Sequence, residues 1–206
     1  EVAELRYLVV VAQSNAAKAE PAFLKALELQ PALSGARELL TKLYLGNQQV
    51  EKAVSSLKAA IEREPNDLGA QMQLGQLQER TKDFTGARVT YEKILAINPK
   101  FAGALNNLAY LYALQLGDLE KAQEMAQRAR EILPTSGETG DTLGWVLLQR
   151  RQFSRALGLL EDSAEKLPKN AEVQYHLGMG FYLTGQEDRA RTQLELALKL
   201  DKDFPG

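Results

Sequence analysis

The sequence predicts an all-α solenoid of about six stacked helix-turn-helix repeats, and two observations carry this prediction. The first is a series of prolines separated by 34 or 35 residues: Pro31, Pro65, Pro99, Pro134 and Pro168. The second is an alanine twelve residues before each proline, in a series that continues once more: Ala19, Ala53, Ala87, Ala122, Ala156 and Ala190. A fixed period of about 20 to 50 residues is typical of stacked-repeat proteins.

Six units of this length fill nearly all of the 206 residues, so we expect one continuous array over residues 1–206. The expected units are approximately 1–33, 34–67, 68–101, 102–136, 137–170 and 171–204. The first unit fits least well, because Tyr7 stands where the last four units have glycine or alanine. The unit that ends near Pro134 contains one extra residue, which we place in the turn at 116–118.

Each unit is expected to contain a first helix (A), a tight turn and a second helix (B). In the third unit, Leu68–Arg80 carries apolar residues at helical spacing, 81–83 is a polar break, and Phe84–Ile97 is apolar on one side. Pro99 then ends the second helix, because proline disfavours the helical state in the residue before it. The same pattern predicts twelve helices in six antiparallel pairs, with no strand.

Small residues recur at one position of helix A, each directly after a leucine: Gly75, Ala109, Gly144 and Gly178. A glycine inside a helix costs about 1 kcal/mol relative to alanine. The repetition of this cost predicts that helix A approaches helix B closely at that point.

The pattern resembles the tetratricopeptide repeat (TPR) family along essentially the whole chain. The third and sixth units carry the family motif best: Leu74-Gly75, Ala87, Tyr91 and Pro99, then Leu177-Gly178, Phe181, Ala190, Leu194 and Ala197. The resemblance implies a right-handed superhelix whose A helices line a concave groove. It also implies a non-catalytic scaffold that binds a protein or an extended peptide in that groove.

Three stretches, 101–114, 141–148 and 173–180, are similar to the terminal repeats of bacterial TPR proteins. Those proteins belong to envelope, secretion and exopolysaccharide systems, including TPR lipoproteins of the exosortase (PEP-CTERM) type. This likeness implies a bacterial multiprotein assembly and favours the periplasm or cell envelope over the cytoplasm.

If A helices line the groove, helical geometry selects the residues about one step of 100° beyond the leucine and the small residue. The predicted partner-binding residues are Met72, Gln76, Asn106, Tyr110, Asp141, Trp145, Tyr175, Met179 and Tyr182. Further positions of this lining are Glu4, Leu8, Glu38, Lys42, Glu79 and Leu148. Aromatic residues and methionine are enriched at recognition surfaces, which points to the last three units. The alternative is that these rings serve packing between neighbouring repeats.

The lining carries more acidic than basic side chains, so a neutral or basic peptide is the preferred partner. The net charge of −2 lacks the basic excess of a nucleic-acid-binding protein. Apolar runs fall short of the roughly 18 residues that a membrane span needs. Because the chain starts at Glu1 without methionine or a basic stretch, we expect it to be a fragment of a longer protein.

An enzymatic role is not expected, and neither is a metal or a cofactor. The chain has no cysteine, its glycines follow the repeat, and its single histidine, His176, is expected at a helix surface or groove edge. Two other functions remain open beside the scaffold. One is a structural element that self-assembles, with a weak homodimer through the array ends, and the other is a docking arm of an enzyme whose catalytic domain lies elsewhere.

Overall fold

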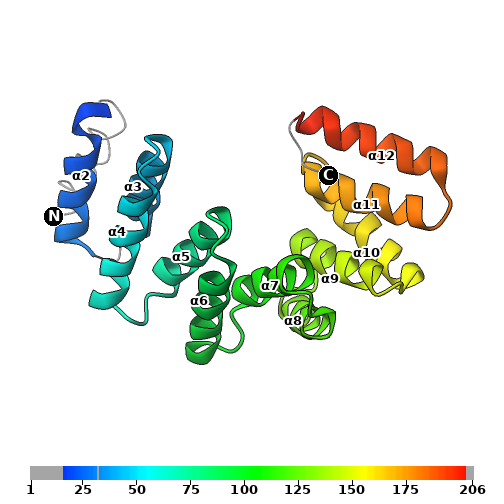
Figure 1. The fold of residues 1–206 in the computed structure, drawn as a ribbon, viewed down its shortest axis with the longest axis horizontal. Helices are drawn as coiled ribbons and strands as arrows, with labels where there is room; N and C mark the ends of the chain where they lie inside the picture. The colour runs from blue at the N-terminus through cyan, green and yellow to red at the C-terminus, as the bar shows by residue number, and fades with distance from the viewer. Residues whose placement is uncertain (1–15, 32, 203–206) are drawn as a thin grey trace. The chain divides into compact units, whose positions relative to one another are not determined.

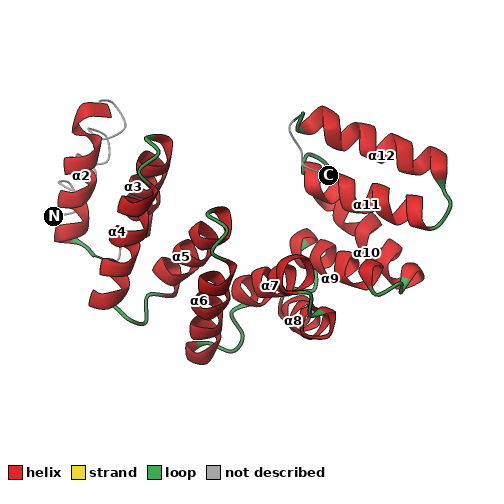
Figure 2. Ribbon diagram, in the orientation of Figure 1, coloured by secondary structure: helices red, strands yellow, loops and turns green. Residues whose placement is uncertain are grey.

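The structure is a computed structural model that describes residues 16–31 and 33–202 (Figure 1). Every regular element within those ranges is helical, as Figure 2 shows, which confirms the all-α prediction. The chain divides into two compact units, Glu1–Ile97 and Asn98–Gly206. Each unit consists of consecutive helices joined by short turns. That the six predicted repeats form one continuous array stays a prediction.

The first unit contains five described helices: α2 (Ala16–Leu29), α3 (Ser34–Gly46), α4 (Val50–Arg63), α5 (Leu68–Arg80) and α6 (Phe84–Ile97). The bounds of α5 and α6 are those that the sequence predicts, because a polar break and a proline end them. The first of the twelve predicted helices, with Glu4, Tyr7 and Leu8, lies outside the described residues.

The second unit contains three helix pairs: α7 (Ala102–Leu111) continued by η1 (Tyr112–Leu116), α8 (Leu119–Ile132), α9 (Gly137–Gln149), α10 (Phe153–Lys166), α11 (Ala171–Leu183) and α12 (Glu187–Leu200). Helices α7, α9 and α11 are the A helices of this unit. Helices α8, α10 and α12 are its B helices.

The small residues lie where A and B helices of one pair meet. A Cβ atom added to Gly144 on α9 would stand 2.8 Å from Cγ of Leu160 and 3.3 Å from the carbonyl oxygen of Ala156, both on α10. A Cβ atom on Gly178 would stand 2.8 Å from Cγ of Leu194 on α12. The predicted close approach is therefore confirmed, and it leaves Ala156 fully buried.

The extra residue of the fourth repeat is not in the turn, as the sequence analysis placed it. It is taken up by helix A, where η1 is a five-residue π-helix that follows the ten residues of α7. The backbone N–H of Gly117 donates to the carbonyl of Tyr112, which is the wider hydrogen-bond spacing of a π turn. The turn to α8 then needs only Gly117 and Asp118, and Gly117 accommodates its φ of 69° without a Cβ.

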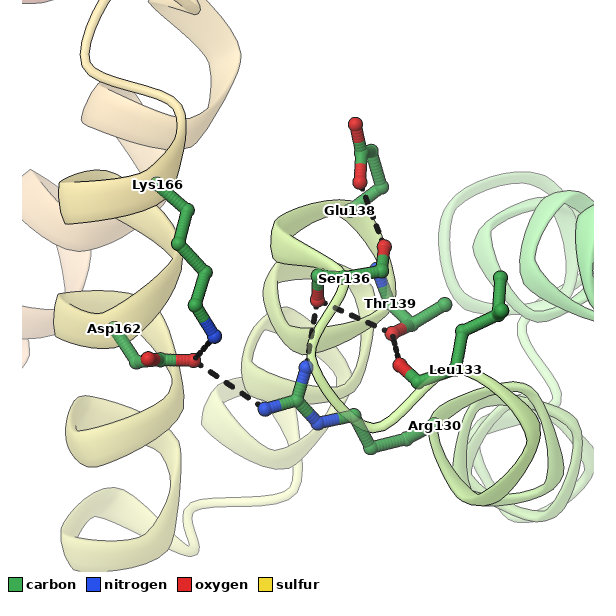
Figure 3. A network of polar contacts seen from close by, with 7 residues as sticks. All are labelled: Arg130, Leu133, Ser136, Glu138, Thr139, Asp162 and Lys166. Atoms are coloured by element: carbon green, nitrogen blue, oxygen red, sulfur yellow. Dashed lines mark hydrogen bonds and ion pairs between the residues drawn. The ribbon is translucent and has the colours of Figure 1, made fainter.

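A polar network connects α8, α9 and α10 (Figure 3). Arg130 on α8 donates through Nη1 to the carbonyl of Ser136 at 2.6 Å, and its Nη2 lies 3.3 Å from Oδ2 of Asp162 on α10. Lys166 donates to the same carboxylate oxygen at 2.7 Å. The hydroxyl of Ser136 caps α9 by accepting from the backbone of Thr139. Arg130 of α8 thus contacts both the start of α9 and the side of α10.

Candidate functional site

Aromatic side chains from the three A helices of the second unit meet in one cluster. We call Tyr110 (α7), Trp145 (α9), Tyr175 and His176 (α11) the ring cluster. Trp145 stacks on His176 with ring centroids 4.1 Å apart and an interplanar angle of 20°. The centroids of Tyr110 and Tyr175 lie 6.2 and 5.9 Å from that of His176. Three of the four aromatic residues that the sequence places on the lining, Tyr110, Trp145 and Tyr175, thus lie around His176, and Tyr182 is not among them.

His176 is buried, with only 1% of its surface exposed, so the expected helix-surface or groove-edge position is wrong. Its Nδ1 lies 2.9 Å from Oδ2 of Asp141 on α9, and Asp141 is itself 7% exposed. The imidazole faces the neighbouring A helix, where it contacts Asp141 and Trp145 of α9. The nearest sequence signal is that Asp141 precedes His176 by 35 residues, about one repeat.

A second polar contact spans the cluster, and sequence reasoning missed it. The hydroxyl of Tyr110 on α7 donates to the carboxylate of Glu172 on α11, 62 residues further along the chain. The phenol and the His176–Asp141 pair thereby link α7, α9 and α11. The rings of Tyr110, Trp145 and Tyr175 are half-buried rather than fully exposed, so packing between repeats accounts for part of their surface.

Three buried polar atoms of the predicted partner-binding residues on α7 and α9 have no hydrogen-bond partner in the protein. They are the donor Nε1 of Trp145 and the acceptors Oδ1 of Asp141 and Oδ1 of Asn106. An unpaired buried donor or acceptor costs about 1–3 kcal/mol. These atoms can therefore gain stability from a group that supplies the missing hydrogen bond.

The remaining predicted residues are distributed differently. Met179 is half-buried and packs on the core of the second unit, as does Trp145. Tyr182 is 60% exposed, beyond the ring cluster on α11. Met72 and Gln76 lie on α5 in the first unit. Leu148, which the sequence analysis placed on the lining, is a core residue with 2% exposure.

The described acidic residues of the predicted lining all have partners. Oε1 of Glu38 lies 2.6 Å from Nζ of Lys42, Glu79 accepts from the hydroxyl of Tyr91, and Asp141 contacts His176. Lys42 compensates the charge of Glu38, whereas the hydroxyl of Tyr91 only donates a hydrogen bond to Glu79.

Within residues 16–31 and 33–202, no cluster of three or more histidine and acidic side chains is placed to hold a metal ion. None of the helices in the same ranges has the length and apolar character that a membrane span requires.

Two family models, both described as "Tetratricopeptide repeat", match this chain. One matches residues 39–101 and 142–205, and the other matches residues 90–124. A TPR repeat-containing protein of Pseudomonas aeruginosa, PA4667, is 26% identical over 74% of this chain. The peroxisomal targeting signal receptor of Candida albicans is 25% identical over 81% of it. The chain spans 27% and 29% of the length of these two relatives.

Solved structures of repeat proteins share the fold. YrrB, described as a TPR protein with an unusual peptide-binding site, aligns with a TM-score of 0.59 at 20% identity, over 89% of this chain and 94% of its own. The Cut9–Hcn1 structure from the APC/C aligns with a TM-score of 0.78 at 16% identity, over 99% of this chain and 41% of its own. At these identities the likeness concerns the fold alone.

Proposed function

Because this chain belongs to the tetratricopeptide repeat family, whose members generally mediate protein–protein interactions, we propose that its second unit binds an extended peptide segment of a partner. The observation that carries the proposal is the ring cluster on α7, α9 and α11. Half-buried aromatic rings that are already held by neighbouring helices offer contact area with little loss of side-chain entropy. The role is that of a scaffold without catalysis.

The unpaired polar atoms of Asn106 on α7 and of Asp141 and Trp145 on α9 favour a peptide over a purely apolar ligand. A peptide backbone carries both N–H donors and C=O acceptors. Trp145 lacks an acceptor, while Asp141 and Asn106 each lack a donor for one oxygen. Since the lining carries more acidic than basic side chains, the preferred segment is neutral or basic.

The cellular setting is part of the same proposal. We place the protein in a bacterial multiprotein assembly, in the periplasm or cell envelope. The support is the resemblance of three stretches to bacterial envelope proteins, together with the relative in Pseudomonas aeruginosa. Within that assembly, the proposed partner is the extended peptide segment described above.

Trp145 is the only tryptophan of the chain, so its fluorescence reports on the ring cluster directly. Peptides selected from a random library for binding to the protein should shift or quench this fluorescence. Tyr175→Ala should weaken their binding by about tenfold or more, as for a hot-spot residue. The control Val89→Ala changes an exposed apolar residue on α6 and should leave binding unchanged.

A footprint of the selected peptides on the outer faces of α8, α10 and α12 would overturn the proposal. So would equal affinity of the parent and Tyr175→Ala, provided that far-UV circular dichroism shows both proteins to be folded.

One observation favours a second candidate function, self-association through the last helix pair. Leu198 and Leu200, two positions apart at the end of α12, are 51% and 37% exposed. Exposed apolar groups of this kind mark interfaces when they are contiguous. Light scattering at rising protein concentration tests it, and a strict monomer would exclude it.

A further inference from the structure

The residue six positions after each inter-repeat proline is buried in every described repeat. This position is occupied by Arg37, Gln71, Leu105, Gly140 and Gln174. The side-chain amides of the two glutamines donate to backbone carbonyls of the turn or helix end that precedes them. Nε2 of Gln71 donates to the carbonyl of Pro65 at 2.6 Å, and Nε2 of Gln174 lies 3.4 Å from the carbonyls of Ala164 and Leu167. A charged residue at this position is thus a departure from the pattern of the chain itself.

Arg37 is 2% exposed and only partly paired. Its Nη1 donates to Oδ2 of Asp67 at 2.6 Å. Its Nε and Nη2 are buried and have no hydrogen-bond partner. The other oxygen of Asp67 accepts from the backbone N–H of Ala70, where it caps α5, so this carboxylate is held in place. The arginine is therefore anchored at one nitrogen and unsatisfied at two.

The two unsatisfied nitrogens form one edge of the guanidinium group. That edge presents two parallel N–H donors, the arrangement that matches the two oxygens of a carboxylate. Hydrogen bonds to charged groups are the strong ones, and an unmade bond from a buried charged group is correspondingly costly. An unpaired donor edge therefore indicates a missing anionic partner.

Arg37 also lines a cavity of about 580 Å³ within the first unit. Its walls come from α2 and α4, and they include the apolar side chains of Leu24, Leu27 and Pro31. The volume lies within the range of about 300–1,000 Å³ found for small-molecule sites. The cavity thus combines an apolar wall with a buried cation.

The charges around the cavity favour a single negative charge. The wall carries two further cations, Lys52 and Arg63, and three carboxylates, Glu28, Glu51 and Glu64. A doubly charged phosphate would meet those carboxylates, whereas a carboxylate needs only the donor edge of Arg37.

The second unit contains a matching cavity that can be compared with the one at Arg37. A cavity of about 650 Å³ lies beside α10 and α12, and the residue that lines it at the matching position is Gln174. The amide donors of Gln174 already point to main-chain carbonyls. That cavity lacks the unpaired donor edge that Arg37 supplies.

We propose that the cavity between α2, α3 and α4 binds a small aliphatic carboxylate. Its carboxylate pairs with Nε and Nη2 of Arg37, and its hydrocarbon part lies against Leu24, Leu27 and Pro31. Because both nitrogens are covered from solvent in the free protein, binding requires a side-chain rearrangement at the cavity wall. This site is separate from the ring cluster and does not depend on the peptide-binding proposal.

Isothermal titration of the whole chain with octanoate tests the proposal, and octanamide serves as the uncharged match. We expect octanoate to bind at least about tenfold more tightly than octanamide, since the donor edge recognises the charge. The carboxylate could come from a free small acid or from the C-terminus of a protein. N-Acetyl-leucine mimics a peptide C-terminus, so comparing its affinity with that of octanoate distinguishes the two. Tighter binding of N-acetyl-leucine than of octanoate would overturn the small-acid assignment.

Arg37→Gln is the decisive variant. Glutamine is the residue that this chain uses at the matching positions 71 and 174, so the variant should fold. It should lose the preference for octanoate over octanamide. Ala59→Leu, which keeps Arg37 and fills the cavity from α4, should weaken both ligands, and it decides the matter if Arg37→Gln fails to fold.

Equal octanoate affinity in the parent and in Arg37→Gln would overturn the proposal, as would no detectable binding by the parent at about 10 mM, a concentration well above a 1 mM dissociation constant. Trp145 fluorescence should stay unchanged throughout, because the ring cluster belongs to the other unit.

Discussion

At the scale of single residues, two glycines in neighbouring helices have opposite surroundings. Gly144 on α9 faces Leu160 and the backbone of Ala156, with no room for a Cβ atom. Gly158 on α10 is exposed, and nothing lies within 4 Å of an added Cβ. The first glycine serves packing, whereas the second only weakens its helix.

We expect Gly144→Ala to lower the free energy of unfolding by about 1–3 kcal/mol through overpacking. Gly158→Ala should raise it by about 1 kcal/mol, because alanine favours the helix and meets no neighbour. Urea melts followed by far-UV circular dichroism measure both changes. Equal effects of the two substitutions would show that the A and B helices do not meet tightly at Gly144.

The contrast between the small residues and His176 shows what repeat position predicts. The contacts of Gly144 follow from position, because the same step of the period brings a glycine against a large residue in two other repeats, Gly75 against Tyr91 and Gly178 against Leu194. The site of His176 does not follow, because its partner Asp141 is particular to one pair of repeats. A histidine beside the core leucine can turn outward or toward the neighbouring A helix, and that choice depends on side chains one repeat away.

At the scale of helices and turns, one backbone feature is common to the five described A–B turns. The residue two positions before helix B has a positive φ in each: Gln48 (58°), Lys82 (63°), Gly117 (69°), Arg151 (59°) and Gly185 (77°). The left-handed conformation costs a residue with a Cβ about 1–2 kcal/mol, and glycine avoids most of this cost. Three of the five turns therefore store strain that the other two avoid.

Lys82→Gly and Arg151→Gly should each raise the free energy of unfolding by about 0.5–1 kcal/mol, the relief of strain less the entropy that glycine loses on folding. Gly185→Ala should have the opposite effect, and it is a clean control because nothing lies within 4 Å of the added Cβ. Thermal melts of the three variants measure the differences. A loss of stability in both glycine variants would mean that their side chains, rather than their backbone, matter in the turn.

The polar network of Figure 3 should make the stability of the protein depend on pH. The hydrogen bond from Lys166, with a smaller contribution from Arg130, holds the pKa of Asp162 below its ordinary value. A depressed pKa in the folded state means that the contribution to stability is present above about pH 4, the ordinary carboxyl value, and is lost as the pH falls through the folded pKa.

Asp162→Asn should therefore lower the free energy of unfolding at pH 7, by less than about 1 kcal/mol, because solvent screens this partly exposed carboxylate. The difference from the parent should shrink as the pH falls below about 4. Urea melts at several pH values measure it. If the difference in unfolding free energy between the parent and Asp162→Asn stays constant down to pH 2, the ion pair of Asp162 does not cause it.

The sequence predicts helix ends better than helix irregularities. A proline two residues beyond helix B and a polar break before it define the bounds of α6. The additional residue of the fourth repeat is visible in the spacing of the prolines, but its location is not. A turn and a π bulge absorb one residue equally well, and the choice made at Tyr112–Leu116 depends on how the following turn closes around Gly117.

At the scale of the whole molecule, the period predicts the repeats but not their grouping. The spacing of 34 residues continues unchanged from Pro65 to Pro99, yet the chain divides into compact units between Ile97 and Asn98. In stacked repeats each unit interacts mainly with its neighbours, so compactness depends on the side chains at each junction. The period itself holds no information on those junctions.

The second unit has what it needs to fold alone. Its core cluster lies entirely within residues 109–190, and it contains Leu147, Leu160, Leu177 and Phe181. Three helix pairs reach the roughly three repeats that a stable stack requires. We expect a fragment of residues 98–206 to be helical and to unfold cooperatively.

Trp145 distinguishes a folded fragment from a collapsed one. In a correctly packed fragment its ring stacks on His176, so its emission maximum and near-UV circular dichroism should equal those of the whole chain. The matched control is the same fragment carrying Gly144→Ala, which should unfold at a lower urea concentration because the close contact between α9 and α10 lies inside the fragment. A red-shifted tryptophan in the unmodified fragment would mean that residues 1–97 are required to hold the ring cluster, and that the six repeats behave as one cooperative array.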